Sequence, residues 1–243
     1  ISLGLVGSEM CIRDSHGDTP INDQPHSTRY VDLYDWEDGD MVDDQDKIRM
    51  LVDPTSDYVK AMVASLNRAK DDVIISSLGG NSRSTSGNII LPTAQKIAVG
   101  GTNLTKAKII QAKTLFRTNE ADEEAGEELY MLYNAAAAAQ ILADTTLTST
   151  DYLAGQFLRE GSVRGKWMGF NWIPTERCPK VSTTRFLYAY AKSGVTLGKG
   201  ADIMTKVGED PGKGFNVRIY AKMSIGSVRV EEEKVVEIAC LEP

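Results

Sequence analysis

The sequence predicts an α+β fold, and three observations carry that prediction. Apolar residues recur at helical spacing from Pro54 to Leu78, over a length that gives a rod of roughly 35–40 Å. Residues 16–53 combine short extended segments with a run of acidic residues. Residues 181–243 are rich in short alternating stretches of apolar and polar residues, which are typical of strands.

The composition is that of an ordinary globular chain. Its 243 residues, 42% hydrophobic and 25% charged, suit one large domain or two small ones. The net charge of −7 argues against direct binding of duplex DNA, because such affinity comes mainly from Lys and Arg neutralising phosphates. No stretch approaches the ~20 apolar residues of a membrane helix, so we expect no membrane association.

Residues 1–15 resemble a translated sequencing-library adapter, and the fold prediction leaves them out. The three cysteines, Cys11, Cys178 and Cys240, are far apart and form no CxxC pair. We therefore expect free thiols in a reducing cytoplasm and no metal site.

An acidic hairpin arm is predicted for residues 16–53. Residues 29–34 and 47–52 alternate like strands, and the acidic residues between them are expected to form the tip. Because two isolated strands are marginal in water, this arm is expected to need a partner surface.

The long helix is expected to begin after Asp53 as its N-cap and to end at Gly79 and Gly80. A second helix is predicted to start near Asn103. Residues 129–133 read as a buried strand, followed by a helix in the alanine run that Asn134 caps.

The remaining elements are short. A helix is predicted from about residue 149 to Gly161, and a strand at 185–191. Residues 228–230 and 235–238 are predicted to be paired strands, with the glutamates between them as a hairpin tip.

The search for catalytic chemistry predicts that the chain is not an enzyme. The two histidines, His16 and His26, lie in the N-terminal segment without a nucleophile on a rigid element. Two glycine clusters, at 194–200 and 208–214, miss the phosphate-loop pattern and are expected to be surface turns. We expect no catalytic residues, no cofactor and no metal.

The acidic run does not match the loop of an EF-hand calcium site. Placing Gly39 at the sixth position of an EF-hand loop puts Tyr34 first and Trp36 third, and neither supplies the oxygen ligand required. The run is therefore expected to be a solvated face, or a surface complementary to basic residues of a neighbouring copy. The candidate basic partners are Arg164, Lys166, Arg177 and Lys180.

Several segments resemble the major capsid proteins of tailed bacteriophages, of the Hong Kong 97-type family. They are residues 19–27, 43–47, 53–56 before the long helix, and 226–232 leading to 235–238. No single segment is diagnostic, and the resemblance rests on their order along most of the chain.

The resemblance implies a Hong Kong 97-like fold with an extended loop at residues 16–53. It further implies a peripheral domain with a spine helix at 54–128, an axial domain at 129–180, and a β-rich return to both domains at 181–243. No lysine–asparagine pair could be matched to a cross-link, so none is assigned.

The resemblance also implies a function: self-assembly of many copies into the icosahedral shell that encloses phage DNA. The shell would assemble in the bacterial cytoplasm and become the virion capsid, with DNA enclosed without sequence-specific binding. Scaffold, portal and decoration proteins are candidate partners. The candidate subunit-interface residues are Arg29, Tyr34, Trp36, Asp40, Asp43, Asp44, Arg164, Lys166 and Trp167.

Two alternatives stay open at this point. An encapsulin-like nanocompartment protein would share the fold and enclose cargo enzymes, so a cargo gene next to this one would indicate it. A calcium-binding surface protein would use the acidic run, and stoichiometric binding in calorimetry would indicate it.

Overall fold

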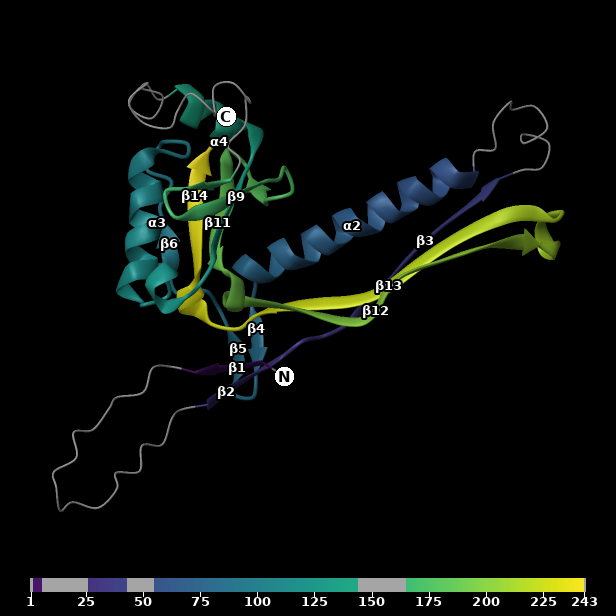
Figure 1. Ribbon diagram of the computed structural model, residues 1–243, viewed down its shortest axis with the longest axis horizontal. Helices are drawn as coiled ribbons and strands as arrows, with labels where there is room; N and C mark the ends of the chain where they lie inside the picture. Colours follow the sequence, from purple (N-terminus) through teal and green to yellow (C-terminus); the bar gives the residue numbers. More distant parts are fainter. Residues whose placement is uncertain (1, 6–25, 43–54, 144–164, 243) are drawn as a thin grey trace, which may run out of the picture.

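The computed structural model describes residues 2–5, 26–42, 55–143 and 165–242 (Figure 1). The chain forms a body around a seven-stranded sheet and a long arm that extends to one side of it. We use "arm" for β3 (Tyr34–Val42), β12 (Val195–Asp210) and β13 (Asn216–Arg229), and "body" for the seven-stranded sheet and the helices packed on it.

The predicted long helix is confirmed as α2 (Thr55–Gly79), which connects arm and body. Met62 and Leu66 are buried in the core of the arm. Ile75 and Leu78, more than two turns further on, are buried in the core of the body. One amphipathic helix therefore takes part in both hydrophobic cores.

The arm is a three-stranded antiparallel sheet in the order β12-β13-β3. β12 and β13 form a long hairpin, whose tip carries the 3₁₀ turn η4 (Pro211–Lys213). One face of the sheet packs on α2 through Ile219, Ala221, Met223 and Ile225 of β13, which are all buried.

The prediction of an acidic tip is wrong for residues 35–40. These residues lie inside β3, which pairs with β13 from Tyr34 opposite Ile225 to Val42 opposite Val217. The predicted strand 29–34 is interrupted at residues 31–33, and residues 47–52 lie outside the described residues. β3 is an edge strand, where charged side chains are tolerated because they stay in solvent.

The body sheet is mixed, in the order β6-β14-β11-β7-β9-β8, with β10 also paired to β11. Its strands are β6 (Lys96–Ile97), β7 (Leu129–Tyr133), β8 (Lys166–Trp167), β9 (Phe170–Pro174), β10 (Lys180–Val181), β11 (Thr184–Ala191) and β14 (Val235–Leu241). The helices α3 (Lys106–Thr118) and α4 (Ala135–Ala143) add Ile109, Phe116, Ala137 and Ile141 to its core. Strands from all three segments 54–128, 129–180 and 181–243 thus share one sheet.

Several local predictions are confirmed in the body. The strand at 129–133 is β7, the strand at 185–191 is β11, and Asn134 Oδ1 accepts a hydrogen bond from the Ala137 amide at 3.0 Å as a helix cap. Helix α3 begins after Thr105, slightly later than predicted, and Asn103 instead accepts from the Leu104 amide at 2.7 Å. The helix predicted near 149–161 lies outside the described residues.

The predicted hairpin at 228–238 is wrong. β13 pairs with β12 and β3 in the arm, whereas β14 pairs with β11 and β6 in the body. The glutamates between them lead into the 3₁₀ turn η5 (Glu232–Lys234), where the chain crosses from one sheet to the other. Alternation shows that a segment is a strand, but it does not identify the strand's partner.

The two glycine clusters differ. Residues 208–214 form the tip of the arm, as predicted for a turn. Residues 194–200 do not form a surface turn, since most of them belong to β12. A Cβ at Gly198 would lie 2.8 Å from Val31, because residues 31–33 cross directly over the hairpin.

A small sheet lies between body and arm, in the order β1-β2-β4-β5. Its strands are β1 (Ser2–Leu5), β2 (His26–Tyr30), β4 (Ser82–Ser84) and β5 (Gly87–Ile89). β1 pairs antiparallel with β2, so residues that the fold prediction left out form a strand. Further 3₁₀ turns are η1 (Thr93–Gln95), η2 (Glu123–Ala125) and η3 (Lys192–Gly194).

Candidate assembly surfaces and the buried junction

Two of the predicted interface residues form an exposed aromatic surface at the base of the arm. Tyr34 is 63% exposed and Trp36 is 38% exposed. They line a hollow of about 390 Å³ together with Val73 and Ser77 of α2 and Ser227 of β13. Exposed Tyr and Trp side chains around a hollow are typical of protein interfaces.

Of the other predicted interface residues, Asp40, Lys166 and Trp167 do not line this hollow. Asp40 is exposed on β3, and its Oδ1 accepts from the Met41 amide at 2.8 Å. Lys166 is exposed, while Trp167 is half-buried with its ring 5.4 Å from that of Trp172. Asp43, Asp44 and Arg164 lie outside the described residues.

Arg29 is buried within its own subunit, and its role at an interface stays a prediction. Only 6% of the residue is exposed. Its Nη2 donates to both carboxylate oxygens of Glu232, at 3.0 and 3.2 Å, and its Nη1 donates to Ser27 Oγ. Sequence alone gave no sign of this pairing, because Arg29 and Glu232 lie at opposite ends of the chain.

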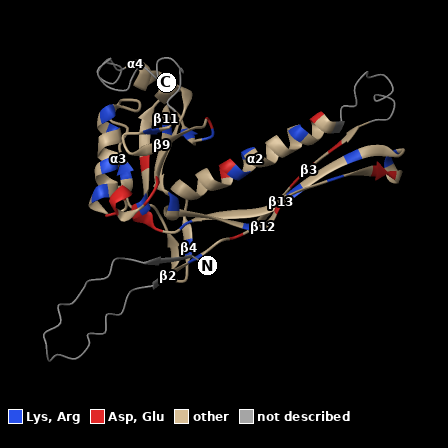
Figure 2. Ribbon diagram, viewed as in Figure 1, with Lys and Arg blue, Asp and Glu red and all other residues tan. Residues whose placement is uncertain are grey.

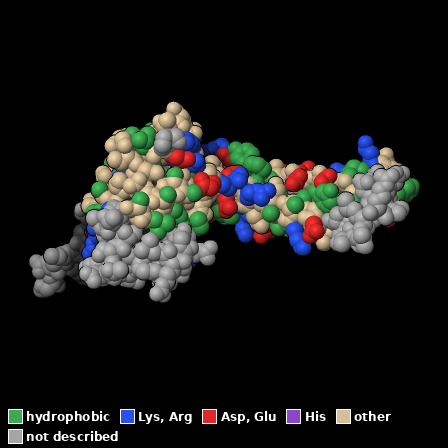
Figure 3. Space-filling model, turned by 90° about the horizontal axis from the view of Figure 1, so that it is seen from above, with side chains coloured by type: hydrophobic (Ala, Val, Ile, Leu, Met, Phe, Trp, Pro, Cys, Tyr) green, Lys and Arg blue, Asp and Glu red, His purple; other side chains and the backbone are tan. Residues whose placement is uncertain are grey.

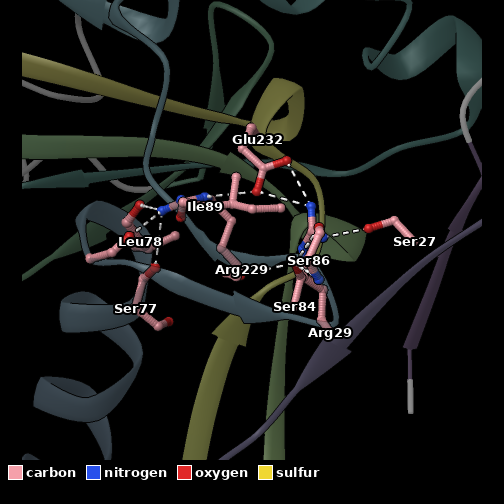
Figure 4. A network of polar contacts seen from close by, with 11 residues as sticks. Ser27, Arg29, Ser77, Leu78, Ser84, Ser86, Ile89, Arg229 and Glu232 are labelled. Atoms are coloured by element: carbon pink, nitrogen blue, oxygen red, sulfur yellow. Dashed lines mark hydrogen bonds and ion pairs between the residues drawn. The ribbon is translucent and has the colours of Figure 1, made fainter.

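Behind Arg29 lies a second buried arginine, Arg229, at the end of β13 (Figure 4). It is fully buried, and it donates to the carbonyls of Leu78 and Gly80 at 2.8 Å and of Ile89 at 3.1 Å. Its Nε lies 3.8 Å from Glu232 Oε1. We call Arg29, Glu232 and Arg229 the arginine network.

Arg229 caps the C-terminus of α2 by donating hydrogen bonds to its last carbonyls. The last turn of α2 contains no basic residue, although its free carbonyls form the negative end of the helix dipole. Arg229 supplies the missing cation and hydrogen-bond donors from a distant part of the sequence. Burial lowers the pKa of Arg229, while the Glu232 carboxylate raises it.

Two of the four predicted basic partners are already paired within the chain. Arg177 binds Asp72 of α2, and Lys180 Nζ lies 3.4 Å from Glu242. Both charge signs occur along α2 and the arm (Figure 2). Pairing of the acidic residues of β3 with basic residues of a neighbouring copy would therefore account for only part of the charge on this surface.

Sequence reasoning missed two exposed apolar side chains towards the tip of the arm. Val207 is 52% exposed and Phe215 is 60% exposed. Phe215 follows Gly214, and both have left-handed backbones, with φ of 62° and 68°, which is unusual for a bulky side chain. A phenylalanine inside a turn of Gly, Pro and charged residues was the available signal. Figure 3 shows hydrophobic side chains exposed between charged ones along the molecule.

The described residues offer little chemistry. They contain no group of three or more His, Cys, Asp or Glu placed to hold a metal, and no helix among them is long and apolar enough to span a bilayer. Burial raises the pKa of Cys178 to about 12 and that of Cys240 to about 11, so both thiols are unreactive at neutral pH.

The chain thus combines a compact body, a helix shared between two cores and an arm with exposed apolar side chains, and known structures share this architecture. The capsid protein of cyanophage P-SCSP1u has the same fold, with a TM-score of 0.71 at 16% identity, over 100% of this chain and 83% of that one. The capsid structure of Helicobacter pylori bacteriophage KHP30 is also similar, with a TM-score of 0.68 at 11% identity, over 98% of this chain and 84% of that one.

The family model described as "Phage capsid protein" matches residues 5–242, and the chain belongs to that family. It is a structural subunit of an icosahedral phage shell. No curated protein sequence matches it significantly. The fold also resembles the encapsulin of Synechococcus elongatus PCC 7942, with a TM-score of 0.56 at 10% identity, over 99% of this chain and 82% of that one.

Proposed function

We propose that this subunit works only by assembly and catalyses no reaction. Copies contact one another through the two apolar surfaces of the arm, the hollow at Tyr34 and Trp36 and the tip at Val207 and Phe215. The shell forms in the host cytoplasm and encloses phage DNA without reading its sequence, with scaffold, portal and decoration proteins as further partners.

The exposed aromatic side chains of the arm carry this proposal. Obligate interfaces commonly bury more than about 2,000 Å². Apolar area contributes about 25 cal/mol per Å², part of which offsets the cost of association. Closure into rings and shells then makes weak individual contacts stable, because each copy is held by several neighbours.

We also propose a revised division of the chain. The body corresponds to the axial domain, and the arm with α2 to the peripheral domain. The β1–β2 strand pair, in place of residues 16–53 as a whole, corresponds to the extended loop. The antiparallel pairing of β1 with β2 beside the junction supports this assignment.

The test is the double variant Tyr34→Asp with Trp36→Asp, compared with the wild type and with Val181→Asp. Val181 is 65% exposed on β10 of the body and serves as the control for adding charge to an exposed apolar position. We expect the wild type and the control to form capsomers or shells in sedimentation and electron microscopy. The double variant is expected to stay monomeric with an unchanged melting temperature.

Assembly of the double variant at the wild-type level would contradict the proposal. Particle contents separate the phage shell from a nanocompartment. Nuclease-protected DNA in particles from infected cells supports the phage shell, whereas a co-purifying cargo enzyme supports the nanocompartment.

A further inference from the structure

The chain leaves β2 through a narrow crossing over the arm. A Cβ at Gly226 of β13 would lie 2.0 Å from the carbonyl oxygen of Asp32, and one at Gly200 would lie 3.1 Å from Leu33. The backbones therefore touch where residues 31–33 cross β12 and β13. This crossing is a fixed point from which β2 extends away from the arm.

Beyond the crossing, few backbone bonds between described residues hold β2 to the rest of the molecule. β2 pairs with β4 at two positions only, Arg29 opposite Ser84 and Tyr30 opposite Arg83, and its other partner is β1. A short two-stranded contact is marginal by itself. The direction of the β1–β2 pair must then depend on side chains close to the crossing.

We propose that the arginine network fixes the direction of the β1–β2 strand pair relative to the C-terminal end of α2. The inference rests on the proposed function and its division of the chain, in which the β1–β2 pair corresponds to the extended loop of a self-assembling subunit. Glu232 lies between the two guanidinium groups, with Arg29 of β2 to one side and Arg229 of β13, which contacts the C-terminal end of α2, to the other (Figure 4).

The charges of the network explain why it acts as a unit. Two guanidinium groups, with side chains 5% and 0% exposed, share one carboxylate that is 17% exposed. The carbonyls at the end of α2 offset part of the Arg229 charge. Within the described residues, Nε of each arginine is buried without a hydrogen-bond partner, so removing Glu232 would leave both guanidinium groups less well compensated.

A control ion pair lies next to the network, between β4 of the small sheet and the crossing. Arg83 of β4 pairs with Asp32 at 2.9 Å, with side chains 63% and 49% exposed. This ion pair also links the small sheet to the crossing, but it is in solvent. Exposed pairs contribute little to stability, whereas breaking a buried pair leaves an uncompensated charge.

The experiment measures hydrogen exchange by mass spectrometry on the monomeric fraction of the full chain. We expect Arg29→Ala to speed exchange at residues 26–30 by roughly a hundredfold, and Arg83→Ala by less than about fivefold. Arg29→Lys should lie between them, because lysine keeps the charge but loses the two-pronged contact. Glu232→Gln should speed exchange both at residues 26–30 and at the end of α2, residues 74–80.

Adding Arg29→Ala to Glu232→Gln should have little further effect at residues 26–30, because both changes remove the same contact. Equal effects of Arg29→Ala and Arg83→Ala would overturn the proposal, as would additive effects of the two network changes. In assembly, Arg29→Ala should give particles of mixed size and Arg83→Ala uniform ones, and uniform Arg29→Ala particles would overturn the proposal. Failure of the wild type to assemble, with the exchange pattern as expected, would reject the proposed function and leave the network's role intact.

Discussion

The body and the arm of this subunit are stabilised to very different degrees. Among the described residues, the core of the body contains 26 buried side chains, from helices, five strands and the segments that connect them. The core of the arm contains seven, from α2 and one face of a three-stranded sheet. The body resembles an independent small domain, whereas the arm depends on a single helix for its packing.

Body and arm also differ in the exposure of their aromatic side chains, and this indicates which part of the subunit is buried by other copies. The body places its large aromatic rings inside, as in the contact of Phe116 with Phe170 at 6.0 Å. The arm leaves Tyr34, Trp36 and Phe215 in solvent. Burial of these side chains between copies would contribute free energy to assembly. Until they are buried, we expect the arm to be the less stable part of the isolated subunit.

Matched core truncations give the largest expected effect. Phe116→Ala should lower the free energy of global unfolding by about 3–5 kcal/mol, because a fully buried ring leaves a cavity. Met223→Ala, at a position 1% exposed in the arm, should mainly speed hydrogen exchange in β13 and β3 while the denaturant midpoint of the body changes little.

Denaturant unfolding and hydrogen exchange on the same two variants separate the outcomes. If Met223→Ala lowered the global unfolding free energy as much as Phe116→Ala, arm and body would be one cooperative unit. The two hydrophobic cores would then differ in size but not in stability.

A buried lysine gives the next largest effect. Lys108 Nζ donates to the carbonyls of Val99, Thr102 and Ala239, each at 2.8 Å, and ties a loop of the body to β14. Lys108→Met keeps the apolar stem but leaves these carbonyls without their donor. We expect a loss of about 2–3 kcal/mol in denaturant unfolding. A loss below about 0.5 kcal/mol would show that water replaces the ammonium group.

Lys108 also predicts a pH dependence. Burial lowers its pKa from the usual 10.5, although Cys240 opposes the shift. Between the folded pKa and 10.5 the unfolded chain binds more protons than the folded one, so the unfolding free energy should rise with pH there. This rise should be missing in Lys108→Met, and its persistence in that variant would assign it to another group.

The sequence predicted local structure well where a pattern is self-contained. The helical spacing of Met62, Leu66 and Leu78 and the cap at Asn134 required no knowledge of distant residues. The prediction of an acidic tip failed because charged residues indicate exposure to solvent, and an edge strand exposes them as well as a tip does. The strands at 228–230 and 235–238 were found, but their partners lie in two different sheets.

The predicted interface residues differ in their exposure. Tyr34 and Trp36 are exposed, whereas Arg29 is buried inside its own subunit. Its true partner is 203 residues away, and no periodicity reports such a pair. Phe215 was missed because its exposure depends on the turn that places it at the end of the hairpin.

The smallest expected effect compares one ion pair in each region at acid pH. In the body, the hydrogen bond from Arg185 lowers the pKa of Glu242, whose side chain is 18% exposed. Between arm and helix, Lys70 lowers the pKa of Asp202, which is 60% exposed. Both carboxylates favour the folded state above their unfolded pKa values of 4.5 and 3.8, and this contribution is lost as the pH falls below them.

Glu242→Gln should therefore flatten the loss of stability below pH 4.5, with no more than about 1 kcal/mol at neutral pH. Asp202→Asn should change the same curve less, because solvent and salt screen the exposed pair. Denaturant unfolding of both variants between pH 3 and 7, at low and at high salt, measures these changes in the free energy of unfolding. A precision of about 0.3 kcal/mol is needed to separate them. A larger acid effect for Asp202→Asn would mean that the arm's ion pairs, and not its small core, hold it against α2.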